Sequence, residues 1–435
     1  MQRRLKQRRV QTLIKVLTII IVLVTFMTAC GSPPKEEIDT LDRYGSSLAR
    51  DLARRYPERP PYSLEERATA QFIVREFKKL GYQPKMQFFK GEPSEESASI
   101  PESANIIVRI PGNGFERDEA MATDLFGKKD ADKTVGRFRA TIVIGAHYDT
   151  IPQEPKEEDG EGEEKGEESG AITLGNFNGI SDNASGIAVL LTLARDLKEQ
   201  SNPIGYDIIL AAFGAGADAR RGSHYFYKSL NKTERNSLDC VYILESLYAG
   251  DNLYASAGLS SAQPGRKMDL RLRLYEFNLA AVDAKIRRVY GVDILNNTSS
   301  LRIPLPGHKP EEEKEAEQIL YREFTLHPGD CEPFDLAGIP CVYIESYNYR
   351  GDTVEEMRDN RSPEFASVNG NIRGSRFDST RTLDEIMPDN TLTLRINAVA
   401  RTLSFVVKRG LLDAKVAAGQ INHTANELPS RTTNP

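Results

Sequence analysis

Residues 140–150, ATIVIGAHYDT, decide the fold class. The apolar part, residues 142–146, is rich in β-branched side chains and lacks polar–apolar alternation, which is typical of a strand buried on both faces of a sheet. His147 and Asp149 follow directly at the carboxyl end of this strand. We therefore predict a buried strand that delivers an imidazole and a carboxylate to one edge of a sheet.

Helix and strand patterns alternate on both sides of this stretch. Apolar residues recur at helical spacing in residues 41–56, 64–80, 185–200 and 391–407. Further strands are predicted at residues 86–89, 104–110, 206–213, 241–244 and 341–344. This alternation predicts a three-layer α/β/α fold, with helices on both faces of a mainly parallel mixed sheet and ligands bound beyond the carboxyl ends of its strands.

Residues 1–30 resemble a bacterial lipoprotein signal peptide. Basic residues crowd positions 3–15, an apolar run follows at positions 16–27, and small residues surround Cys30. The run is shorter than the ~20 residues that a membrane-spanning helix needs. We expect Cys30 to be lipidated and the folded part to lie outside the cytoplasm, anchored to the bacterial cell membrane. An uncleaved N-terminal anchor is the alternative.

The rest of the chain divides into three parts. A tether at residues 31–37 leads into one domain, residues 38–410, and a tail follows at residues 411–435. Residues 154–170 are rich in Glu, Gly and Lys, which predicts a solvated acidic loop near the end of the strand that carries His147. The formal net charge of -6 combines 57 basic and 63 acidic residues and gives no indication of nucleic-acid binding.

Three cysteines remain besides Cys30, namely Cys240, Cys331 and Cys341. This odd number allows one disulfide bond with one thiol left over. The spacing does not choose the pair, and no CxxC pattern indicates a structural zinc site.

Five short motifs occur in the order and approximate spacing of one enzyme family. They are HYDT at residues 147–150, SDNASG at 181–186, FGA with GS within 213–223, GDCEPF at 329–334 and FDSTRTLDEI at 377–386. On these motifs the chain resembles the zinc aminopeptidase family of peptidase clan MH. That family also includes glutaminyl cyclases, glutamate-releasing carboxypeptidases and receptor ectodomains without activity. The resemblance implies a zinc exopeptidase-like fold.

The resemblance also implies one half of a two-metal site. In active members two zinc ions share a bridging carboxylate and a water molecule, and a separate glutamate acts as general base. The first His ligand corresponds to His147, the bridging carboxylate to Asp182 and a third ligand to Glu245. Asp149 would orient His147 as a supporting residue.

The other half of the site is missing. The family's pair of glutamates, general base and zinc ligand, falls on Gly216 and Ala217, and its C-terminal His falls on Phe377. None of these side chains can bind a metal or move a proton. The pocket motif keeps Asp330 but has Cys331 where the family has His.

The retained residues allow two interpretations. They can form a single residual zinc site, or they can have a purely structural role. His147 and Asp149 can serve hydrogen bonds at the strand end and the following turn. Asp182 with Asn183 can cap the helix predicted at residues 185–200. In that case no metal is bound.

We therefore predict a membrane-anchored, degenerate member of this family that binds a peptide or protein ligand without catalysis. The alternative is a divergent zinc-dependent exopeptidase with one metal at His147, Asp182 and Glu245, and with Glu332 or Asp218 as base. Loss of a general base alone lowers a rate by ~10²- to 10⁴-fold. The sequence shows no compensating nucleophile motif.

Overall fold

The computed structural model describes residues 42–92, 101–117, 136–150, 175–199, 204–262, 267–297, 300–304, 317–321, 323–327, 329–351 and 354–416. These residues belong to one compact unit that starts at Thr40. The predicted signal peptide with Cys30, the tether and the acidic loop at residues 154–170 lie outside the described residues.

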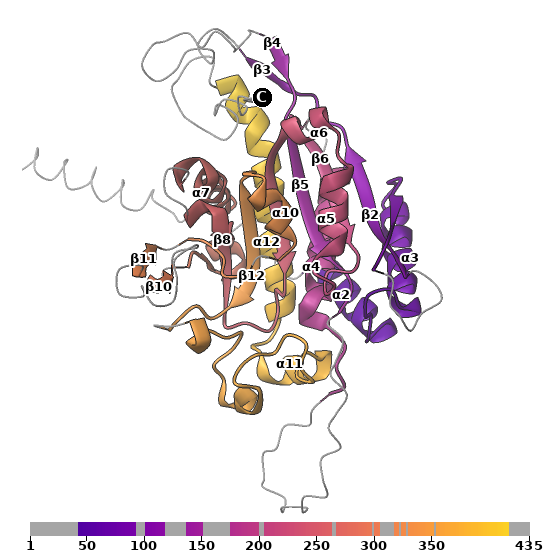
Figure 1. Ribbon diagram of the computed structural model, residues 1–435, viewed down its shortest axis with the longest axis vertical. Coiled ribbons are helices and arrows are strands. Elements are labelled where there is room, and N and C mark those ends of the chain that lie inside the picture. Colours follow the sequence, from indigo (N-terminus) through magenta and orange to yellow (C-terminus); the bar gives the residue numbers. More distant parts are fainter. Residues whose placement is uncertain are drawn as a thin grey trace, which may run out of the picture. The chain divides into compact units, whose positions relative to one another are not determined.

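An eight-stranded sheet forms the centre of this unit (Figure 1). Across the sheet the strands are β1 (Lys85–Lys90), β2 (Glu102–Ile110), β6 (Asp207–Phe213), β5 (Thr141–His147), β7 (Leu238–Glu245), β12 (Cys341–Tyr347), β8 (Asn252–Ala257) and β9 (Ile294–Leu295). The four central strands β6, β5, β7 and β12 are parallel, and so are β8 and β9. The pairs β1–β2, β2–β6 and β12–β8 are antiparallel. The predicted mainly parallel mixed sheet is confirmed.

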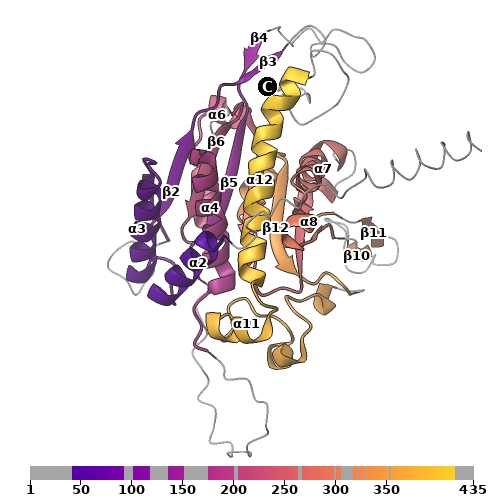
Figure 2. The ribbon, with the colours of Figure 1, turned by 180° about the vertical axis from the view of Figure 1, so that it is seen from behind.

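Helices cover both faces of the sheet. The larger apolar core lies between the sheet and one group of helices, which Figure 2 shows from behind: α2 (Tyr44–Arg55), α3 (Leu64–Lys79), α4 (Ser185–Glu199), α7 (Lys267–Asp283) and α12 (Thr391–Val416). A smaller core on the opposite face is covered by α5 (Arg221–Ser229) and α10 (Glu332–Leu336). The three-layer arrangement therefore agrees with the prediction.

The remaining elements are short. They are α6 (Lys232–Ser237), α8 (Ile286–Tyr290), α11 (Thr380–Ile386) and two two-stranded ribbons, β3 (Phe115–Arg117) with β4 (Gly136–Phe138) and β10 (Ser300–Pro304) with β11 (Glu317–Tyr321). α12 continues past residue 410, where the sequence predicted that the tail begins. Within the described part of the chain, no helix has the length and apolar character needed to cross a membrane.

Strand β5 shows why the site forms where it does. Every residue of the strand is buried, because its side chains pack into the apolar cores on both faces of the sheet. A Cβ atom at Gly145 would lie 2.4 Å from the ring of Phe213 on β6, so this position needs glycine. The strand is thereby fixed in the middle of the sheet, and His147 emerges at its carboxyl end.

Candidate metal site

Three neighbouring elements bring His147, Asp182 and Glu245 together. His147 ends β5, Glu245 ends the adjacent parallel strand β7, and Asp182 lies in the turn Ile180–Ala184 that precedes α4. His147 Nε2 lies 3.1 Å from Asp182 Oδ1 and 3.0 Å from Glu245 Oε1. One possible ligand atom from each residue lies within 4.8 Å of the others. The three side chains form a cluster that can hold a metal ion.

Two buried oxygens test whether a metal fits this cluster. Within the described residues, Asp182 Oδ1 and Glu245 Oε2 have no hydrogen-bond partner, although both side chains are buried. Asp182 Oδ1 approaches His147 Nε2 without the angles of a hydrogen bond. Such unsatisfied buried oxygens cost free energy, and a cation between them removes that cost. Imidazole and carboxylate are also preferred zinc ligands, so the residues fit one divalent cation.

The charges around His147 agree with a cation at this place. Burial lowers the pKa of the imidazole, but Glu245, Asp149 and Asp182 outweigh burial and raise that pKa well above its usual value. In the absence of metal, a proton on His147 therefore supplies positive charge between the carboxylates. A metal binds neutral imidazole, so metal binding releases this proton.

The other ring nitrogen of His147 faces the backbone of Asp149. His147 Nδ1 lies 3.1 Å from the Asp149 carbonyl oxygen and 3.5 Å from Asp149 Oδ1. An N–H at Nδ1 donates to the carbonyl and leaves Nε2 directed at the other two ligands. The carboxylate of Asp149 accepts the backbone amides of Gly216 at 2.7 Å and Ala217 at 2.8 Å. The supporting role predicted for Asp149 thus falls mainly on its carbonyl.

The turn that carries Asp182 is held by Asp378 and Asn183. The Asp378 carboxylate accepts the backbone amides of Ser181 at 2.8 Å and Asp182 at 3.0 Å. Asn183 Oδ1 accepts the amide of Gly186 at 3.1 Å, in the first turn of α4. Asn183, rather than Asp182, therefore caps the helix. The Asp182 carboxylate is left to face His147.

Arg59 is buried and ties the two halves of the site to one another. Its Nε donates to the Tyr148 carbonyl at 2.8 Å, next to His147 in the chain. Its Nη2 donates to the Gly179 carbonyl at 3.0 Å, just before the Asp182 turn. Two more carbonyls accept bonds from Nη1. Burial lowers the pKa of Arg59 to about 10, so the guanidinium keeps its charge at neutral pH.

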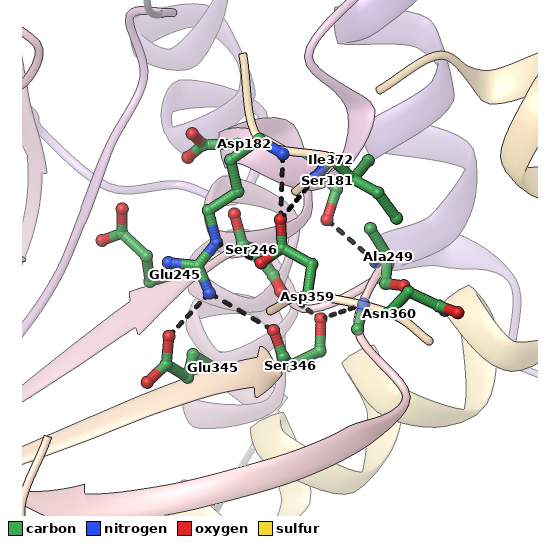
Figure 3. Close-up of polar contacts among 12 residues, drawn as sticks. Ser181, Asp182, Glu245, Ser246, Ala249, Glu345, Ser346, Asp359, Asn360 and Ile372 are labelled. Carbon is green, nitrogen blue, oxygen red and sulfur yellow. Dashed lines mark hydrogen bonds and ion pairs between the residues drawn. The ribbon is translucent and has the colours of Figure 1, made fainter. Parts of the chain in front are cut away.

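An ion-pair cluster lies beside Asp182 and Glu245 (Figure 3). Arg373 Nη2 donates to Glu345 Oε2 at 2.6 Å, and Arg373 Nε lies 3.0 Å from Asp359 Oδ1. Glu345 is the register partner of Glu245 on the neighbouring strand β12. Burial raises the pKa of the nearby Asp182, but His147, Arg373 and Arg59 outweigh burial and keep this carboxyl ionised.

The loop that should carry the general base is built of small residues and held in place. A Cβ atom at Gly216 would lie 2.8 Å from the Cβ atom of His147, so the loop backbone closely approaches the retained ligand. The amide of Ala215 donates to Glu66 at 2.8 Å, and the next two amides donate to Asp149. Ala217 is exposed. Neither Gly216 nor Ala217 provides a metal ligand or a base.

Phe377, which the motif resemblance aligns with the family's C-terminal His, is buried. It is 4% exposed and packs edge-to-face against Phe365, with ring centroids 5.6 Å apart. The next residue, Asp378, binds the Asp182 turn, so position 377 lies beside the retained ligands. The structure thus brings Gly216 and Phe377 to the same end of the sheet as His147. Neither the hydrogen of Gly216 nor the phenyl ring of Phe377 can bind a metal ion.

Asp330 has the properties of a functional carboxylate. It is 1% exposed, and neither of its oxygens has a hydrogen-bond partner within the described residues. Burial raises the pKa of Asp330 to about 7; His147 lowers this pKa and Glu245 raises it further. Cys331 was also predicted for the pocket. It lies with Phe334 in the smaller apolar core, on the face of the sheet that α5 and α10 cover.

The two bases considered for a divergent enzyme are engaged elsewhere. Glu332 Oε2 accepts Arg220 Nε at 2.9 Å and lies 2.9 Å from His224 Nε2. Asp218 accepts hydrogen bonds from Tyr62 and Arg221. Ion pairing lowers the availability of both carboxylates for proton transfer. Neither replaces the missing glutamate.

Sequence reasoning missed three residues that shape the site: Arg59, Glu66 and Asp378. Asp378 directly follows Phe377 in a recognised motif, so its position carried a signal. Glu66 lies three residues after Ser63, the N-cap of α3, yet its carboxylate accepts the amides of Tyr62 at 2.6 Å and Ala215 at 2.8 Å. Arg59 had no local signal, because its partners are carbonyls from distant segments.

The fold and the site together define a zinc exopeptidase-like α/β/α domain with one candidate metal position. Residues 131–284 match the model of peptidase family M28. This match confirms the resemblance drawn from the motifs. The chain is also similar to the alkaline phosphatase isozyme conversion protein of Escherichia coli (strain K12), with 23% identity over 367 residues, 84% of this chain and 89% of that protein.

Solved structures of glutaminyl cyclases share the fold. The Porphyromonas gingivalis enzyme superposes with a TM-score of 0.51 at 15% identity, covering 85% of this chain and 98% of that chain. The Fimbriiglobus ruber enzyme gives a TM-score of 0.50 at 16% identity, covering 85% of this chain and 95% of that chain. These similarities confirm the predicted fold class.

Proposed function

We propose that this chain is an extracytoplasmic protein, anchored to the bacterial membrane by a lipid on Cys30, whose M28 domain binds one zinc ion without cleaving peptide bonds. His147, Asp182 and Glu245 hold the ion. Its ligand is a peptide or a protein, bound in part through an oxygen atom that faces the ion.

One observation carries this proposal: the asymmetry of the site. Three metal-ligand side chains converge within 4.8 Å, with buried oxygens that lack hydrogen-bond partners among the described residues. At the positions of the other metal and of the base, Gly216, Ala217 and Phe377 offer no donor atom. A site of this kind supports metal binding but lacks the groups for proton transfer.

The proposed loss of activity follows from what the chain's own residues can do. When bound, zinc supplies a positive charge that attracts and polarises an oxygen of a ligand. Peptide hydrolysis also needs a base that accepts a proton from the attacking water and passes it to the leaving amine. The carboxylates next to the loop, Glu66 and Asp149, already accept backbone amides. They hold the loop and are not directed at a ligand.

Asp330 favours a second candidate, a hydrolase with a single zinc ion. This buried carboxylate has no hydrogen-bond partner within the described residues, and its pKa of about 7 suits proton transfer near neutral pH. It is influenced by the charges of His147 and Glu245, so it lies near the metal position. In this candidate function Asp330 acts as the general base, a role that Gly216 cannot have.

An assay of the purified full-length chain separates the two candidates. The non-catalytic proposal predicts no release of amino acids from aminoacyl anilides or short peptides, with or without added zinc. Chelator-sensitive turnover that disappears in His147→Ala would contradict it. If turnover also disappears in Asp330→Asn but persists in Glu332→Gln, the single-zinc hydrolase is the better account.

A further inference from the structure

Two cysteines meet on the face of the sheet that α5 and α10 cover. Cys341 is the first residue of β12, and Cys331 ends the short turn Gly329–Cys331 that leads into α10. Cys341 Sγ lies 3.8 Å from the Cys331 carbonyl oxygen, and both residues are 1% exposed. Burial and the adjacent thiol of Cys331 both raise the pKa of the Cys341 thiol. The two side chains are therefore neighbours in the core.

The strand register excludes the third cysteine of the domain from this pair. Cys341 is paired with Val241 of β7, and both lie in the core on the α5 and α10 face. Successive side chains of a strand point to opposite faces of the sheet. Cys240, one residue before Val241, accordingly lies in the core on the α4 and α12 face. The sheet itself separates Cys240 from Cys341.

The chain between the two cysteines turns back on itself, which brings them together. α10 ends at Leu336, and the amides of Gly338 and Ile339 donate to the carbonyls of Asp335 at 2.9 Å and Phe334 at 3.0 Å. The chain then enters β12 at Cys341. A bond between the two sulfurs would close this short loop without involving any other element of the fold.

We propose that Cys331 and Cys341 form a disulfide bond in the mature protein. The two sulfurs join, each thiol gives up its hydrogen, and two electrons with two protons pass to an oxidant. In the cell the oxidant is the disulfide of an extracytoplasmic thiol oxidase, and in vitro diamide serves. The bond fixes the turn that carries Asp330 against the start of β12. It rests on the proposed extracytoplasmic location, but on neither zinc binding nor peptidase activity.

Peptide mapping of the full-length chain tests the proposal. The protein is exported with its own N-terminus, denatured in iodoacetamide without reductant, and cleaved with a protease that cuts on the amino side of Asp. Cleavage before Asp335 separates the two cysteines. We expect one pair of peptides, containing Cys331 and Cys341, that stays joined until reductant is added, with Cys240 alkylated. Alkylation of both Cys331 and Cys341, or any linkage that includes Cys240, would overturn the proposal.

Variants provide an independent readout. The variants are reduced and then treated with diamide, and the free thiols of the domain are counted before and after diamide. In Cys240→Ser the count should fall by two, as it does in the wild type. In Cys331→Ser and in Cys341→Ser the count of free thiols should not fall, because the remaining cysteine has no partner within reach. Loss of a thiol pair in Cys331→Ser would contradict the assigned pairing. The mapping of the wild-type chain decides the question even if a serine variant does not fold.

Discussion

Asp149 Oδ1 accepts the backbone amide of Gly216 at 2.7 Å, and this bond ties the loop that carries Gly216 to the strand end that carries His147. The amide of Ala217 donates to the second oxygen of the same carboxylate at 2.8 Å. The carboxylate two residues after His147 therefore holds a loop whose side chains at positions 216 and 217 cannot bind a metal or move a proton.

A side chain at position 216 should disturb this arrangement. In Gly216→Ala the new Cβ atom would approach the Cβ atom of His147 to 2.8 Å, so the loop or the strand end must shift. We expect a loss of about 1–3 kcal/mol in the free energy of unfolding, measured in urea, together with weaker zinc binding. The exposed neighbour provides the control, because Ala217→Ser should change stability by less than about 0.5 kcal/mol. Equal stability of the two variants would show that the loop does not pack closely against His147.

The stability of the metal-free protein should fall as pH rises from about 4 to 7. The pKa of Asp330 is raised to about 7 in the folded state, whereas an aspartate in an unfolded chain titrates near ~3.9. The folded state therefore binds more protons in this window, and ionisation of the buried group removes stability as pH rises. We expect Asp330 to account for on the order of 2–4 kcal/mol of this loss.

Urea denaturation in chelator at pH 5 and pH 8 measures the effect. Asp330→Asn should make the decline smaller without abolishing it, because burial also raises the pKa of Glu66 and of Asp378 to about 7. Glu332→Gln should keep the wild-type decline, because ion pairing lowers the pKa of Glu332 and this group stays ionised across the window. The assignment fails if Asp330→Asn and the wild type decline equally.

Replacement of Arg59 should weaken the whole site. Arg59→Met leaves four backbone carbonyls without their donor, among them those of Tyr148 and Gly179. We expect a loss of about 3–5 kcal/mol in stability and a lower zinc affinity, because the strand end and the Asp182 turn are no longer tied together. Arg54→Met, at an exposed position, should be nearly neutral. An Arg59→Met protein with normal zinc affinity would show that the turn is held in other ways.

Membrane attachment should depend on Cys30. Cys30→Ala removes the thiol that receives the lipid, so the chain should not be processed at this site and should leave the lipid-anchored membrane fraction. Cys240→Ala is the matched control and should stay attached. Detergent phase partitioning of cell extracts gives the readout. A Cys30→Ala chain that is processed and retained like the parent would contradict the predicted lipid anchor.

Elements that bury a long apolar face were predictable from the sequence. The run at residues 142–146 became β5, and the periodic pattern after Asn183 became α4, because each pattern matches one buried environment. The strand β8 was missed: its sequence NLYASA is short and contains small or polar residues, and only contact with β12 makes it a strand. The antiparallel pairs at the sheet edges were also not predictable, since direction depends on distant connections.

The site was predictable only where a motif fixed the residue. His147, Asp182 and Glu245 each follow a recognisable strand or precede a recognisable helix, and the structure brings them together. Whether Asp182 or Asn183 caps α4 could not be decided from sequence, because both side chains suit a cap. The hydrogen bond from Gly186 to Asn183 settles the cap and leaves Asp182 beside His147. Arg59 depends on backbone carbonyls, which have no sequence signature.

The zinc content of the purified chain tests the central claim most directly. After dialysis against zinc and then against zinc-free buffer, elemental analysis should find one zinc ion per wild-type chain. It should find almost none in His147→Ala, and one in His224→Ala, whose imidazole pairs with Glu332 away from the site. Two ions per chain, or none, in the wild type would contradict a single site formed by His147, Asp182 and Glu245.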